Sequence, residues 1–525
     1  LLDTTLLNEL PAEYDRERLR LHTLLRAFAK SEFAKLPPEV QQNTLQAICA
    51  YYADYVPNAS KTSKAALDAD RANINAAIEW AHAQGKRNLV VQLCVPMADY
   101  WGKRWFTRDS LKLLPLGVEA AAAIELQDTT PHNRRITADL RLALARALRR
   151  TDKLDEAEKL FTADLAYRQA EGDREGEARV LLRLGEVSRI RGQLGEAENH
   201  YKNSLSIWHD LLDHKRLEGL ALGYLGRIEY LRANYEKAAA YYEDSLHIAE
   251  QQGDLEGVGR VWNSLGQVAL ARGAMSEAQG YFTAALERLR EQGDKPGVGD
   301  VLTGMGRLAI DRADFEQANV CLTEALKIDQ DIVDFQGDAV DRSLLAQVKL
   351  ENGEREEARR AFLENVHLRK RAHDPRGEGV DHSFLGRIAM EEWIASKGRP
   401  ISEQDSLTNA RDEYEQALGL AREVGNKRGE GASLNYLGII AILADNAVEA
   451  KQRLDESMRI AANEVHSEPD NARAILSQGL YALRIEHDAK KGQRFFEQAI
   501  QRYDKMQRPL DLKRARKMWA EWTEL

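Results

Sequence analysis

A pattern of small and large apolar residues recurs along most of this chain at a nearly constant spacing. A Leu-Gly pair, or a close equivalent, returns every 40 or 41 residues with one step of 52. The pairs are Leu184-Gly185, Leu225-Gly226, Leu265-Gly266, Met305-Gly306, Leu345-Ala346, Leu385-Gly386 and Leu437-Gly438. In all but one repeat an Ala follows twelve residues later, and a large apolar residue stands four positions beyond that Ala. Such repetition predicts a repeat architecture rather than one compact core.

Each repeat is predicted to form two antiparallel helices. A small residue such as Gly266 lets the helices cross closely, and an aromatic residue such as Phe282 fills the space beside it. Glycines at the predicted helix ends, for example Gly253, Gly273 and Gly293, suit left-handed caps. We therefore expect an all-α superhelical solenoid with a repeat of about 40 residues.

The pattern also predicts the domain organisation. The solenoid is expected over residues 136–505, with about eight or nine repeats, and a capping helix over 506–525. Twelve extra residues precede Ala410, and they include Gly398 and Pro400. Because Pro and Gly interrupt helices, we expect a lengthened connection near residues 391–408.

The repeat resembles the tetratricopeptide repeat (TPR) family, in a longer 40-residue form found in signalling scaffolds. The small-residue and aromatic positions carry the likeness. The resemblance implies a binding surface, and it does not identify the ligand.

The first 135 residues follow another pattern. The segment Arg18–Ala29, which contains His22, resembles the winged-helix end of the NB-ARC module in STAND signal-transduction ATPases. The segment Asp70–Trp80 resembles the helix that follows it in bacterial TPR-bearing regulators. The resemblance implies that residues 1–36 are the end of a winged-helix domain and 37–135 a helical adaptor. It also implies ATP or ADP in a longer protein, where His22 contacts the ADP.

No G-x-x-x-x-G-K-[ST] phosphate loop occurs in the sequence, and the chain starts mid-pattern without Met. We therefore expect the C-terminal part of a longer protein, with no cofactor and no catalytic activity of its own.

Composition narrows the choice of partners. A net charge of −10 disfavours nucleic acid, and no apolar run approaches the ~20 residues of a membrane span. The three cysteines are far apart, and no metal-ligand spacing occurs. These features predict a cytoplasmic protein without a metal site.

Polar residues on the first helix of each repeat form a candidate ligand groove. The candidates are Arg146, Arg179, Arg189, Arg227, Arg260, Asn263, Gln267, Arg307, Gln347, Arg387 and Asn435. Arginines in a row suit carboxylates or phosphates, although a solvated helix face would show the same residues.

The leading hypothesis is the effector-sensing part of a STAND regulator. A protein, a peptide or an anionic small molecule would bind in the groove, and without it the ATPase would stay autoinhibited. Activation would assemble a homo-oligomer. The alternative hypothesis is a standalone scaffold that binds a peptide of a partner protein.

Overall fold

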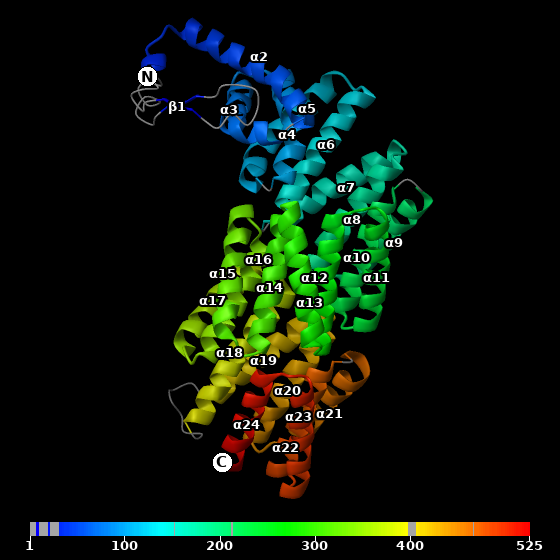
Figure 1. The fold of residues 1–525 in the computed structure, drawn as a ribbon, viewed down its shortest axis with the longest axis vertical. Coiled ribbons are helices and arrows are strands. Elements are labelled where there is room, and N and C mark those ends of the chain that lie inside the picture. The colour runs from blue at the N-terminus through cyan, green and yellow to red at the C-terminus, as the bar shows by residue number, and fades with distance from the viewer. Residues whose placement is uncertain are drawn as a thin grey trace. The chain divides into compact units, whose positions relative to one another are not determined.

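The computed structural model describes residues 7–9, 19–21, 31–62, 64–104, 106–151, 153–211, 214–396, 406–465 and 467–524. The chain divides into two compact units, Leu1–Leu148 and Arg149–Leu525. Apart from one short hairpin, the described elements are helices, and the prediction of an all-α solenoid is confirmed (Figure 1).

The first unit combines a short β-hairpin with helices α2–α6. Strands β1 (Leu7–Glu9) and β2 (Leu19–Leu21) pair antiparallel. The helices are α2 (Pro38–Thr62), α3 (Lys64–Ala83), α4 (Arg87–Lys103), α5 (Thr107–Gln127) and α6 (Pro131–Leu148). Helix α4 contacts the other four and buries Met97 and Trp101 among them. Helix α6 belongs to this unit, although the repeat pattern predicts the solenoid from residue 136 onward.

The second unit is built from consecutive antiparallel helix pairs, each packed on the next. The pairs are α8 (Arg174–Ile190) with α9 (Leu194–Asp210), α10 (Lys215–Leu231) with α11 (Tyr235–Gln251), α12 (Leu255–Arg272) with α13 (Met275–Gln292), α14 (Lys295–Asp311) with α15 (Phe315–Ile332), α16 (Phe335–Glu351) with α17 (Arg355–Arg371), α18 (Pro375–Ala395) with α19 (Ser406–Glu423), α20 (Lys427–Leu443) with α21 (Ala447–Ile460), and α22 (Glu468–Arg484) with α23 (Ala489–Lys505). Helix α7 (Leu154–Ala170) precedes the pairs, α24 (Pro509–Glu524) follows them, and the π-helix η3 (Ala461–Val465) extends α21.

The repeated small residue lies directly against the large apolar residue of its own pair. A Cβ added to Gly266 would lie 2.7 Å from Cε1 of Phe282, and one added to Gly226 would lie 2.8 Å from Cε1 of Tyr242. Phe282 and Tyr242 are buried. The predicted role of this position in helix crossing is therefore confirmed. Gly253, Gly273 and Gly293 all have positive φ, as their predicted cap positions require.

This contact predicts a specific cost for enlarging the small residue. Gly266→Ala should lower the free energy of unfolding by about 1–3 kcal/mol, because the new methyl group overpacks Phe282. Gly280 on α13 is the matched control, since a Cβ added there meets nothing within 4 Å. Gly280→Ala should stabilise by about 0.5–1 kcal/mol through helix propensity. Urea and thermal unfolding followed by circular dichroism would measure both, and similar effects of the two substitutions would contradict the packing argument.

The insertion begins as helix. Helix α18 has 21 residues and continues to Ala395, so the first residues of the expected connection near 391–408 extend the helix. Helix α19 begins at Ser406, and residues 397–405 lie outside the described residues.

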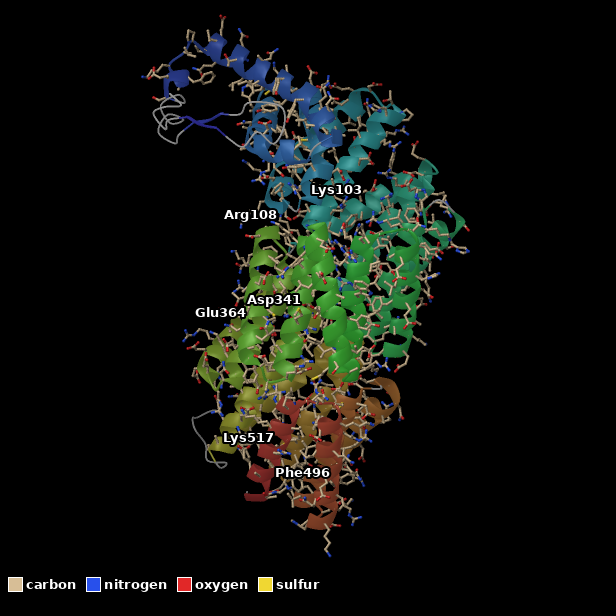
Figure 2. All side chains as sticks on the ribbon, in the orientation of Figure 1. Lys103, Arg108, Asp341, Glu364, Phe496 and Lys517 are labelled. Atoms are coloured by element: carbon tan, nitrogen blue, oxygen red, sulfur yellow. The ribbon has the colours of Figure 1, made fainter. Side chains whose placement is uncertain are left out.

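Late repeats of the second unit contact earlier repeats through residues near the ends of their helices. Arg376 near the start of α18 donates from Nη2 to the carbonyl of Leu231 at the end of α10, over 2.8 Å. Arg508 before α24 pairs with Asp311 at the end of α14, with Nη2 and Oδ1 2.8 Å apart. Figure 1 shows α20–α24 as a tier below α12–α17 within this unit. Helix α24 is fixed further by Trp519, which stacks on Phe496 of α23 at 4.8 Å between ring centroids. Phe496 is labelled in Figure 2.

Candidate ligand-binding face of the solenoid

The first helices of the pairs form the inner layer of the second unit. Alternate helices contact one another along the series α10, α12, α14, α16, α18 and α20, in addition to contacting their pair partners. In a curved array the elements that crowd together lie on the inner side. The inner face is therefore made by these first helices, where the sequence predicts the ligand groove.

Several predicted groove arginines are already paired with carboxylates. Arg387 contacts Glu351 at 2.6 Å and Glu391 at 2.8 Å. Burial alone would raise the pKa of Glu351, but Arg387 and Arg514 lower it to about 2. Two other predicted residues are also engaged, Arg260 with Asp294 and Arg179 with Glu175. Arg387 therefore does not offer the free guanidinium that an unbroken arginine row would need.

Arg227 and Arg307 have no carboxylate partner within the described parts of the chain. Arg227 donates to Oε1 of Gln267 at 2.5 Å, and its guanidinium lies 5.4 Å from the ring centroid of Tyr230. Arg307 is exposed and makes no hydrogen bond or ion pair with a described residue. Although the side chain is exposed, nearby protein atoms desolvate its guanidinium, and this lowers the pKa of Arg307. The charge of Arg227 lowers that pKa further, whereas the carboxylate of Asp341 acts in the opposite direction.

A third arginine joins these two from a distant repeat. Arg376 is half-buried, and its hydrogen bonds to described residues go to neutral oxygens, the carbonyl of Leu231 and Oδ1 of Asn426. Burial, together with the charge of Arg227, lowers its pKa to about 10. Arg307 and Arg376 both lie within electrostatic range of Tyr230 and Arg227. We call Arg227, Arg307 and Arg376 the arginine cluster.

Sequence reasoning did not identify Arg376. It lies at the start of a first helix, whereas the predicted row lies in the middle of those helices. It reaches Leu231 only because α18 returns to the end of α10, a contact that spans 145 residues. A single sequence carries no signal for that contact.

The remaining candidates lie in different surroundings. Arg189 and Gln347 are half-buried on α8 and α16. Asn263 and Asn435 are buried, and their side chains have amide atoms without a hydrogen-bond partner. Arg146 belongs to the first unit. His22 lies outside the described residues, so its contact with ADP stays a prediction.

Asn435 also lines a small cavity between α20, α21, η3 and α22. Ser457, Ile460, Asp470 and Arg473 are among its other lining residues. Asp470 pairs with Arg428 at 2.7 Å, so the charges here are satisfied internally. Within the described ranges, no group of three His, Cys, Asp or Glu side chains is placed to hold a metal ion, and no helix is long and apolar enough to cross a membrane.

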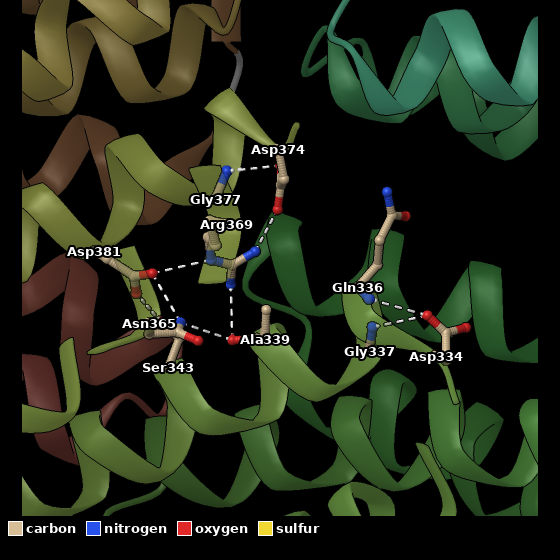
Figure 3. Close-up of polar contacts among 10 residues, drawn as sticks. All are labelled: Asp334, Gln336, Gly337, Ala339, Ser343, Asn365, Arg369, Asp374, Gly377 and Asp381. Carbon is tan, nitrogen blue, oxygen red and sulfur yellow. Dashed lines mark hydrogen bonds and ion pairs between the residues drawn. The ribbon is translucent and has the colours of Figure 1, made fainter. Parts of the chain in front are cut away.

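A buried ion pair stabilises the junction between α16, α17 and α18 (Figure 3). Asp381 on α18 is 0% exposed, and its Oδ2 accepts from Nε of Arg369 at 2.9 Å. Arg369 also donates to Asp374 and to the carbonyl of Ala339. Ser343 donates to the other carboxylate oxygen of Asp381 at 2.6 Å. These contacts satisfy both charges, so this cluster is structural.

Comparison with known proteins identifies the fold. The tetratricopeptide repeat model matches residues 176–251 and 257–331, which span α8–α11 and α12–α15. A crystal structure of a Rap protein complexed with competence and sporulation factor has a TM-score of 0.50 at 13% identity, covering 70% of this chain and 98% of that one. The fold is a tetratricopeptide-repeat solenoid. No curated protein matches the chain.

Two further solved structures are similar over part of the chain. One is a STAND protein with a tetratricopeptide repeat sensor from Pyrococcus horikoshii, with 15% identity and a TM-score of 0.39 over 75% of this chain and 53% of that one. The other is the apo form of RapI, with 13% identity and a TM-score of 0.39 over 55% of this chain and 98% of that one. These scores are too low for either structure to support a functional argument.

Proposed function

We propose that the second unit is a protein-binding module whose inner face takes an acidic segment of a partner protein or peptide at the arginine cluster. The observation behind this proposal is that no carboxylate among the described residues pairs with Arg227, Arg307 or Arg376. A guanidinium offers planar pairs of N–H donors that match a carboxylate. A chain with a net charge of −10 has abundant acidic residues, so three arginines without a carboxylate are not explained by composition.

A bound partner fits this fold better than catalysis. The described residues that we assign to the site are cations and amides, without a nucleophile beside a general base. The Rap protein that shares the fold is complexed with a factor, which supports a binding role on this scaffold. An anionic small molecule is the alternative ligand for the same arginines.

The proposal predicts which peptides the chain selects from a random octapeptide library. Selected peptides should be rich in Asp and Glu, and their Kd should rise with added salt. The double variant Arg227→Gln/Arg307→Gln should weaken binding at least about tenfold, because each desolvated charge-assisted contact contributes about 1.5–3 kcal/mol. Its Tm should stay close to that of the parent.

The control is Lys237→Gln/Lys327→Gln, which removes two positive charges from exposed positions on second helices. This double variant should bind as the parent does. Failure to select any peptide would contradict the proposal, and so would equal losses in the two double variants.

We further propose that the chain is the sensor part of a longer STAND-type ATPase that binds ATP or ADP. Partner binding would then release autoinhibition and favour a homo-oligomer. The resemblance of the segments around His22 and Asp70–Trp80 supports this setting, and a standalone scaffold is the alternative. The sequence upstream of Leu1 distinguishes them, because a phosphate loop there would support the sensor, whereas a full-length protein without one would support the scaffold.

A further inference from the structure

Helix α14 carries a second free charge on the same side as Arg307. Asp300 precedes Arg307 by seven residues, which is two helical turns or about 10 Å along the helix. Asp300 is exposed and makes no hydrogen bond or ion pair with any residue in the described ranges. The charged groups within its range come from several elements: Arg227 of α10, Arg260 of α12, Asp294 before α14 and Asp334 before α16. Asp300 therefore faces the inner layer, as Arg307 does.

Unpartnered carboxylates lie behind Asp300. Asp329 of α15 is 7% exposed, and its carboxylate has no hydrogen bond or ion pair among the described residues. A Cβ added to Gly337 would collide with its carboxylate oxygens, so Asp329 points at the first turn of α16, beside Asp334. Asp341 accepts from Thr303 at 2.7 Å through Oδ1, whereas its buried Oδ2 has no hydrogen-bond partner among the described residues. Buried carboxylates are normally paired, yet these have no ion-pair partner among the described residues, and the charge of Arg307 reaches Asp341 only from a distance.

Asp300 and Arg307 do not neutralise each other. Side chains pair along a helix at separations of three or four residues, and these two are seven apart. In the neighbouring repeat the residue equivalent to Asp300 is Arg260, which is held by Asp294 at 2.7 Å. The equivalent residues Leu220 and Val380 are apolar and 37% and 42% exposed. The inner face thus offers opposite free charges beside exposed apolar side chains.

We propose that the partner segment is bipolar, with a cationic group at Asp300 and a carboxylate at the arginine cluster. This deepens the proposed function and rests on it. A spacing of about 10 Å corresponds to three residues of extended chain, at 3.3–3.6 Å each. The cationic group is either a Lys or Arg side chain or a peptide N-terminal amine. Either would be held by Asp300, with Asp334 adding negative charge nearby.

Selection of displayed random octapeptides on the full chain tests this spacing. Peptides selected by the parent should combine an acidic residue with a basic residue about three positions away. Asp300→Asn should abolish the preference for the basic residue and keep the acidic preference, whereas Arg307→Gln should do the reverse. Selected peptides should bind Asp300→Asn at least about tenfold more weakly than the parent.

Two further arms complete the design. Libraries with free and with acetylated N-termini show whether Asp300 binds the N-terminal amine or a basic side chain. Acetylation removes the charge of the amine, so it should weaken binding only if the amine is the group that is bound. Asp331→Asn, an exposed charge on the outer helix α15, should leave the selection unchanged. Acid-rich peptides without a basic preference, or a basic preference that survives in Asp300→Asn, would overturn this inference and leave the proposed function standing. If no peptide is selected, the proposed function itself fails.

Discussion

Replacing Arg369 by Met is expected to destabilise the second unit by about 3–5 kcal/mol at pH 7, because it leaves a buried charge without its partner. Asp381 is fully buried, and Arg369 supplies the only cation bonded to it among the described residues. Burial already raises the pKa of Asp381 despite the presence of Arg369. Removing the guanidinium should raise that pKa further.

The loss should depend on pH in a defined direction. In the variant, Asp381 can take up a proton as the pH falls, so the difference from the parent should shrink as the pH is lowered from 7. Arg360→Met is the matched control, because Arg360 is exposed on the same helix, α17. It should change stability by less than about 0.5 kcal/mol. Urea unfolding at pH 7 and pH 4.5 would measure this, and equal destabilisation by both substitutions would contradict the ion-pair argument.

Asp329→Asn is expected to stabilise the protein, with an effect that grows as the pH rises. Position 329 corresponds to Arg369 one repeat earlier, but it places a carboxylate opposite the buried Asp341. Burial, with Asp334 and Asp341 nearby, raises the pKa of Asp329 from its ordinary 3.8 to about 9. The folded chain therefore holds a proton that the unfolded chain releases above about pH 4.

The sign of the pH dependence follows from this difference. The contribution of the protonated Asp329 is fully present below about pH 4 and is lost as the pH rises toward 9. Each unit of raised pKa corresponds to about 1.4 kcal/mol, so Asn should gain at least about 2 kcal/mol at pH 8 and little at pH 4. Thermal unfolding across this range, with Asp331→Asn as the exposed control, would measure the gain. A parallel shift at all pH values would contradict it.

Asp329→Arg tests the same comparison by restoring the arrangement around Arg369. Asp334 and Asp341 occupy the positions that Asp374 and Asp381 occupy one repeat later. The new guanidinium would have two carboxylates to pair with, and it should stabilise at pH 7. Destabilisation by Arg, together with no gain from Asn, would show that Asp329 is satisfied in another way.

The repeat pattern was sufficient to predict local structure. The contact of Gly266 with Phe282 and the left-handed glycine at position 293 follow from spacing alone, because both partners lie in one repeat. The pattern did not predict which charges are neutralised, because equivalent positions in different repeats have different neighbours. Arg307 and Arg387 are equivalent in sequence, yet Glu351 and Glu391 neutralise only Arg387.

By itself, the sequence determined the helix pairs and their order, since these depend on residues fewer than about 40 positions apart. Only the tertiary structure decided which inner charges remain free. It brings Arg376 to Leu231 across 145 residues, and it places Asp329 beside Asp341 without an ion-pair partner in the described part of the chain. The physical reason is that a charge is neutralised by whatever lies nearest in space, and the return of α18–α24 to earlier repeats sets those neighbours.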